Sequence, residues 1–152
     1  MSETMAVQEH ICDWIAQATQ VIDFGIDAAS VSSGRTPIPP QGVRLNSSSQ
    51  GEVTGPKLNG KVVATDYLLI RADGVGIINL QAVLTTVEGD RIAIQASGIL
   101  TLVQGSAISQ FRHNLSFHTA APKYSWLNRI QGWGTGTLDI ATMKIVAKVF
   151  AA

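Results

Sequence analysis

The sequence is poor in features that mark several large classes of protein. It has one cysteine, Cys12, among 152 residues, so no internal disulfide can form, which is typical of a reducing compartment. Charged residues make up only 14% of the chain, and the formal net charge is zero. Nucleic-acid binding needs clustered lysine and arginine to displace counterions from phosphates, and the sequence has no such cluster. We therefore expect no nucleic-acid partner.

Long apolar runs are also missing. The first ten residues lack the basic start and the apolar stretch of a secretory signal, and no run approaches the roughly 18 residues of a membrane span. These absences predict a cytoplasmic protein without a membrane partner. With 45% hydrophobic residues, the chain is long enough for one domain over residues 1–152, and its neutral charge is compatible with a homodimer.

What the sequence does contain is an alternation typical of strands. Apolar and polar residues alternate over 91–102 and 138–150, which is the period of a half-buried strand. The turn sequences Ala72-Asp73-Gly74 and Glu88-Gly89-Asp90 predict hairpins, because glycine supplies the positive φ of a tight turn. Together these signals predict a three-stranded meander over 61–71, 75–87 and 90–104.

Two segments are harder to assign. Residues 36–60 hold four of the five prolines and the triplet Ser47-Ser48-Ser49, so we expect a long loop or short edge pieces. Near the amino terminus, apolar residues from Ile11 to Ile22 approximate helical spacing, while Val21, Ile22, Phe24 and Ile26 suit a strand. On pattern alone, a short helix is favoured there.

The motifs from residue 51 onward, taken in order, resemble a known bacterial family. They are Gly51-Glu52-Val53-Thr54-Gly55-Pro56-Lys57-Leu58-Asn59-Gly60, Thr65-Asp66-Tyr67, Asp73-Gly74, Phe111-Arg112, Phe117, Tyr124-Ser125-Trp126-Leu127-Asn128-Arg129 and Gly134-Thr135-Gly136. This series is similar to domain of unknown function 3237, also called uncharacterised protein family 0311. The resemblance implies an all-β fold, a closed antiparallel β-barrel of about eight strands of the allene-oxide-cyclase type. It therefore favours a strand over residues 14–24, and it implies no particular reaction.

Several positions depart from the family pattern. A typical Asp and Arg pair falls on Asn79 and Gln81, a Thr on His113 and a Glu on His118. Charges have thus become neutral amides, and two histidines have appeared. If these side chains face a cavity, its ligand is less charged than the usual family ligand or is handled by different chemistry.

Asp66 is the first candidate for a catalytic residue. On the strand predicted over 61–71 it shares a face with the apolar residues Ala64 and Leu68. A carboxyl group on such a face loses hydration, which raises its pKa and suits a general acid or base near neutral pH. The alternative is a structural carboxylate that caps a turn or pairs with Arg112.

Arg112 and His113 are the other two catalytic candidates. The Arg112 guanidinium can clamp a carboxylate or a developing enolate, can neutralise Asp66, or can lie on the solvated side of its strand. His113 shares its face with Phe111 and Leu115, so it is either a core histidine with one hydrogen bond or a base in a cavity.

No metal or cofactor is expected. His113 and His118 are five residues apart in a predicted strand and therefore point to opposite faces, and His10 is remote from both. The segment from Gly132 to Gly136 does not match a dinucleotide-binding loop and better fits a bulge or a barrel corner.

The remaining candidates are side chains that could bind a substrate. Aromatic walls with a few polar points suit a small apolar molecule, and they equally suit a plug at a barrel end. The expected substrate-binding residues are Tyr67, Asn79, Gln81, His118, Tyr124, Trp126 and Trp133. In particular, we expect Asp66, Asn79, Gln81 and Arg112 to border one cavity, with Trp126 or Trp133 near its mouth.

Three functions fit these features. The first is a cofactor-independent isomerase, cyclase or lyase that acts on a small hydrophobic or weakly polar metabolite inside the barrel. The second is a non-catalytic carrier or sensor of such a molecule. The third is a structural interaction module with a barrel filled by its own side chains, since eight strands are only just wide enough to enclose a ligand.

Overall fold

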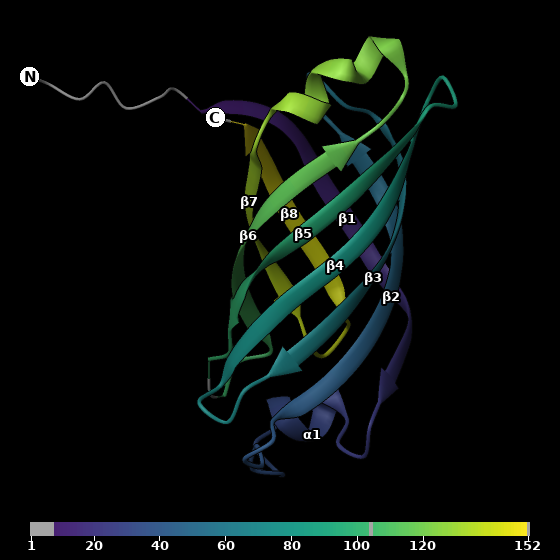
Figure 1. The fold of residues 1–152 in the computed structure, drawn as a ribbon. Coiled ribbons are helices and arrows are strands. Elements are labelled where there is room, and N and C mark those ends of the chain that lie inside the picture. Colours follow the sequence, from purple (N-terminus) through teal and green to yellow (C-terminus); the bar gives the residue numbers. More distant parts are fainter. Residues whose placement is uncertain (1–7, 104, 152) are drawn as a thin grey trace, which may run out of the picture.

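In the computed structural model, which describes residues 8–103 and 105–151, eight antiparallel strands close into a barrel (Figure 1). The strands are β1 (Glu9–Asp23), β2 (Val43–Thr54), β3 (Gly60–Ile70), β4 (Val75–Thr86), β5 (Arg91–Thr101), β6 (Ile108–His118), β7 (Gly132–Asp139) and β8 (Lys144–Ala151). A short helix, α1 (Ala28–Ser32), follows β1, and a 3-10 helix, η1 (Pro122–Arg129), joins β6 to β7. Each strand pairs with the next, and β8 pairs with β1. The predicted closed barrel of about eight strands is confirmed.

Alternation of apolar and polar residues decides which side chains face inward. On β6, Phe111, Leu115 and Phe117 are buried, while Arg112 and Asn114 are exposed. The strands β3, β4 and β5 show the same period and form the meander that the turn sequences predict. Burial of the apolar face inside the barrel supplies the driving force for this arrangement.

The amino-terminal segment is a strand and not a helix, as the family resemblance implied. A register shift between His10 and Cys12 lets Ile11 and Cys12 both point inward, after which every second residue through Ala16 is buried. This bulge explains why the spacing resembles that of a helix. Beyond the bulge, Ile15 lies on the outer surface, 51% exposed.

Two other predicted boundaries are wrong. Residues 43–54 form β2, so the serine triplet lies on a strand and not in a loop. The strand predicted over 138–150 is interrupted by a turn between β7 and β8. Leu138 and Ile145 pair across that turn and both face the interior, and because they are seven residues apart, the alternation changes phase at the turn.

The two ends of the barrel are closed differently, and Figure 1 shows η1 at one end and α1 at the other. Beneath η1, the interior is filled by fully buried residues: Leu58, Leu84, Ile92, Leu115 and Leu127. At the α1 end, Ile26, Val31 and Ile38 of the β1–β2 connection are only partly buried against the core. The interior near η1 is therefore solid, which leaves the other half for a cavity.

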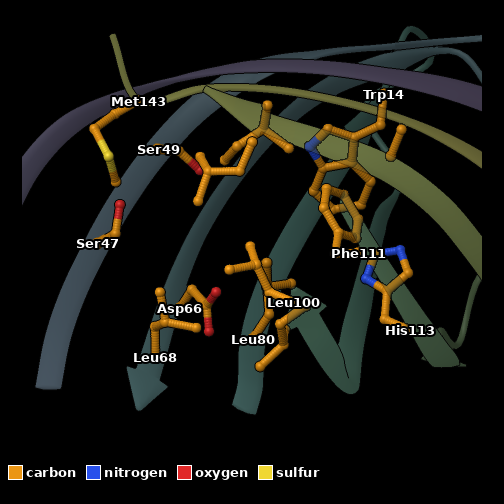
Figure 2. Close-up of a pocket in the computed structure, with 14 residues that line it drawn as sticks. Trp14, Ser47, Ser49, Asp66, Leu68, Leu80, Leu100, Phe111, His113 and Met143 are labelled. Carbon is orange, nitrogen blue, oxygen red and sulfur yellow. The ribbon is translucent and has the colours of Figure 1, made fainter. Parts of the chain in front are cut away.

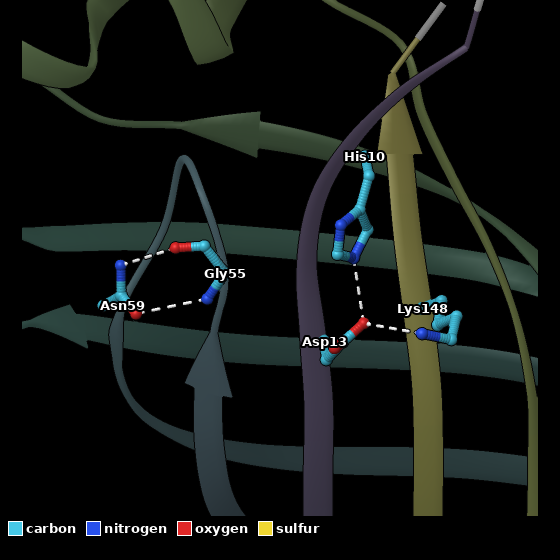
Figure 3. Close-up of polar contacts among 5 residues, drawn as sticks. All are labelled: His10, Asp13, Gly55, Asn59 and Lys148. Atoms are coloured by element: carbon cyan, nitrogen blue, oxygen red, sulfur yellow. Dashed lines mark hydrogen bonds and ion pairs between the residues drawn. The ribbon is translucent and has the colours of Figure 1, made fainter.

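On the outer surface, polar contacts link β1 to β8, where the barrel closes, and stabilise the β2–β3 turn (Figure 3). Asp13 Oδ1 of β1 lies 2.9 Å from His10 Nε2 and 3.5 Å from Lys148 Nζ of β8. In the β2–β3 turn, Asn59 Oδ1 accepts from the Gly55 N–H, and its Nδ2 donates to the Gly55 carbonyl. No helix in the part of the chain that is described is long and apolar enough to cross a membrane.

Candidate functional site

A cavity lies inside the barrel and is lined by residues from all eight strands and from the β7–β8 turn (Figure 2). Its lining is Trp14, Ser47, Ser49, Asp66, Leu68, Ile78, Leu80, Leu100, Phe111, His113, Leu138, Met143, Ile145 and Ala147. The volume is about 50 Å³, room for a few water molecules. A larger ligand must displace flexible side chains, and the unbranched Met143 is the most adaptable of these.

Asp66 is fixed at the cavity wall by a hydrogen bond to the backbone. The ladder between β3 and β4 is interrupted just after the pair Asp66 and Leu80, and it resumes at Leu69. In this gap, Asp66 Oδ1 accepts a hydrogen bond from the Asn79 backbone N–H at 3.0 Å. One carboxyl oxygen is therefore held by β4, while the second is available to a molecule in the cavity.

The surroundings of Asp66 favour its neutral form. The carboxyl group lies among apolar side chains such as Leu68 and Leu80, as Figure 2 shows, and no lysine or arginine lines the cavity. Loss of hydration raises the pKa of Asp66 to about 6, against which the Asn79 N–H acts in the opposite direction. The group can thus donate a proton below that pH and accept one above it.

His113 lines the same cavity from β6. Burial lowers its pKa to about 4, so the imidazole is neutral near pH 7. Its Nε2 has no hydrogen-bond partner among the described residues, and the ring makes an edge contact with Phe111, 5.0 Å between centroids. The hydrogen bond expected of a core histidine is thus not found at Nε2, and the side chain lies at the cavity.

Glycines on β7 make room for the rings of β6. A Cβ atom added to Gly134 would lie 2.6 Å from Nε2 of His113, and one added to Gly136 would lie 2.7 Å from the Phe111 ring. Any larger residue at these positions would push a ring aside. The glycine-rich segment therefore shapes the cavity wall.

Two serines interrupt the apolar face of β2 at the level of the cavity. Val43 and Leu45 are buried before them, and Ser47 and Ser49 follow at the same period of two. Ser47 is the direct cross-strand partner of Asp66. Neither serine was predicted as a site residue, because the nearby prolines suggested a loop, although the alternation was visible in the sequence.

Three predicted cavity residues point outward. Arg112, Asn79 and Gln81 are exposed on the outer surface, since Phe111, Ile78 and Leu80 occupy the inward positions beside them. The expectation that they border one cavity with Asp66 is wrong, and so is a pairing of Asp66 with Arg112. Asn79 contributes only its backbone N–H.

The expected aromatic walls also lie elsewhere. Tyr67, His118 and Trp133 belong to outward positions of their strands. Tyr124 and Trp126 lie in η1, where Tyr124 is buried and its hydroxyl donates to Glu88 Oε2 at 2.9 Å. None of these five residues, including Trp126 and Trp133, lines the cavity. The tryptophan that lines the cavity is Trp14, which was not among the predicted site residues.

The histidines lie apart. His113 is inside the barrel, His118 points outward, and His10 contacts Asp13 on the outer surface. Within residues 8–103 and 105–151, no three His, Cys, Asp or Glu side chains are grouped as they would need to be to hold a metal ion.

A curated fungal enzyme is similar in sequence to part of this chain. A hydroalkoxylation enzyme, phnH of Penicillium herquei, is 28% identical over 92 residues, which is 60% of this chain and 55% of that protein. The chain thus spans about half the length of this curated relative.

Solved structures share the fold. A beta-barrel like protein from Acinetobacter baumannii AYE has a TM-score of 0.76 at 19% identity, covering 95% of this chain and 94% of that one. An enzyme from Penicillium herquei has a TM-score of 0.66 at 18% identity, covering 99% and 98%. The family model described as "Protein of unknown function (DUF3237)" matches residues 18–152. This match covers most of the chain, and the protein therefore belongs to the DUF3237 family.

Proposed function

We propose that the barrel is a cofactor-independent enzyme that adds a hydroxyl group of a small, uncharged substrate across a carbon–carbon double bond of the same molecule. The observation that carries this proposal is the Asp66 carboxyl group, which faces an apolar cavity with a pKa raised to about 6. The similarity to a hydroalkoxylation enzyme supports the reaction class. The product is a cyclic ether and an isomer of the substrate.

The proposed step needs one proton donor and one proton acceptor. Protonated Asp66 gives its proton to one alkene carbon, so the π bond breaks and a C–H bond forms. The hydroxyl oxygen attacks the other carbon and forms the C–O bond, and its proton returns to the Asp66 carboxylate. Atoms and charge balance without an oxidant or reductant, and the catalyst is regenerated.

The cavity walls bind the apolar part of the substrate and add no charge to the site. Trp14, Phe111 and Leu100 provide apolar surface that holds the alkene chain against the carboxyl group. His113 is neutral and adds no charge. An apolar site also strengthens the interaction of the carboxylate with positive charge that develops on carbon.

A deuterium experiment tests the proposal. Incubation with 2-allylphenol in heavy water is expected to give 2-methyl-2,3-dihydrobenzofuran with one deuterium in its methyl group, because the solvent-exchanged proton of Asp66 is delivered to carbon. Mass spectrometry and NMR measure the label. Product without deuterium would exclude protonation of carbon, and bound but unconverted 2-allylphenol would indicate a carrier.

A further inference from the structure

Ser47 places a buried hydroxyl group at the cavity wall. The residue is 8% exposed, and its Oγ has no hydrogen-bond partner within the described residues. Buried hydroxyl groups in proteins are nearly always paired, since leaving one unpaired is unfavourable. The partner of this hydroxyl must therefore come from whatever fills the cavity that Ser47 lines.

The strand register places this hydroxyl beside the proposed acid. Ser47 on β2 and Asp66 on β3 are direct cross-strand partners, and both line the cavity. Directly opposed residues of an antiparallel pair have Cβ atoms about 4.5–5.5 Å apart. A ligand oxygen bound to Ser47 is consequently next to the Asp66 carboxyl group.

The cavity lining also restricts the charge of the ligand. None of its residues is lysine or arginine, and His113 is neutral near pH 7. A carboxylate or phosphate would be buried there without a countercharge, which is strongly unfavourable. A neutral hydroxyl group can both donate to Ser47 and accept from it.

A flexible side chain, Met143, lines the same cavity as Ser47. In Figure 2 the Met143 side chain points toward the Ser47 hydroxyl. Met143 lies in the β7–β8 turn, and its φ of 58° is in the left-handed region. Its three rotatable bonds allow the thioether to swing away when a ligand enters.

From these observations we propose that Ser47 is the binding site for the substrate's own hydroxyl group, which makes the substrate class an uncharged hydroxylated alkene. This inference rests on the proposed function for the reaction and on the cavity geometry for the binding site. Ser47 thereby holds the nucleophilic oxygen where the proton of Asp66 is delivered.

Two probes that differ by one hydroxyl group test this site through binding alone. Ligand-observed NMR titrations compare 2-allylphenol with allylbenzene for the wild-type protein, Ser47→Ala and Ser48→Ala. Ser48 is the matched control, because it is the next residue on β2 and contacts Thr65 instead of the cavity. Thermal unfolding verifies that each variant is folded.

The wild-type protein and Ser48→Ala are expected to bind 2-allylphenol about five- to tenfold more tightly than allylbenzene. In Ser47→Ala the preference should fall below about twofold, with allylbenzene affinity unchanged. Equal binding of the two probes by the wild-type protein, a preference that survives in Ser47→Ala, or binding of neither probe would overturn the assignment. These titrations measure binding and not turnover. An error in the proposed reaction would therefore leave their result unchanged, whereas an error in the oxygen-binding site would change it.

Discussion

Asp66→Asn is expected to lower the rate of the proposed cyclisation by about 10²- to 10⁴-fold, the usual contribution of a general acid. The fold should be retained, because asparagine has the same shape and its Oδ1 can still accept from the Asn79 N–H. Turnover of 2-allylphenol measures the effect. Glu52→Gln, which removes a carboxylate from the outer face of β2, is the matched control and should leave the rate unchanged.

The pH dependence of turnover follows from the same group. The reaction needs the protonated acid, so the wild-type rate should fall as pH rises through about 6, the pKa of buried Asp66. Residual activity of Asp66→Asn should lack this fall. A variant that keeps most of the wild-type rate would rule out Asp66 as the acid, and His113 would then be the remaining titratable group among the lining residues.

Leu127→Ala is expected to destabilise the protein by about 2–5 kcal/mol, the range for removing a large buried side chain. Leu127 lies in η1, is 0% exposed, and fills the barrel at the end away from the cavity. Urea unfolding measures the change, with the exposed Ser125 of the same helix as control in Ser125→Ala. A loss below about 1 kcal/mol would mean that η1 does not hold this end of the barrel together.

The meander strands could be predicted because a half-buried strand leaves a period of two in the sequence, whereas the closed barrel of about eight strands was implied by the family resemblance. The period of two placed Asp66 on an apolar face and His113 on the same face as Phe111, and both line the cavity, although Arg112 on the opposite face of that strand was expected there. The strand β1 was obscured by its bulge, and the serines of β2 were obscured by nearby prolines. In both places a local sequence signal contradicted the alternation, and the segment nevertheless forms a strand because it pairs with both of its neighbours in the closed sheet.

The site was predicted less well, because motif membership does not decide which way a side chain points. Phe111 and Arg112 are neighbours on β6 and necessarily face opposite sides. The aromatic ring occupies the interior because its burial is favourable, whereas an unpaired guanidinium there would be costly. The same alternation put Ile78 and Leu80 inside and Asn79 and Gln81 outside. The position of Tyr124 and Trp126 relative to the cavity could not be predicted. Which end of the barrel η1 covers depends on the order of the strands in the closed sheet, and the local sequence pattern does not show it.

The proposed chemistry depends on an Asp66 carboxyl group whose pKa is raised to about 6 by an apolar cavity. Carbon-detected NMR of the aspartate side chains, titrated against pH and assigned with Asp66→Asn, measures its pKa directly. A midpoint near pH 6 is expected, well above the value of 3.8 for a hydrated aspartate. A midpoint at or below 3.8 would show a hydrated or ion-paired carboxylate and would contradict the proposed chemistry.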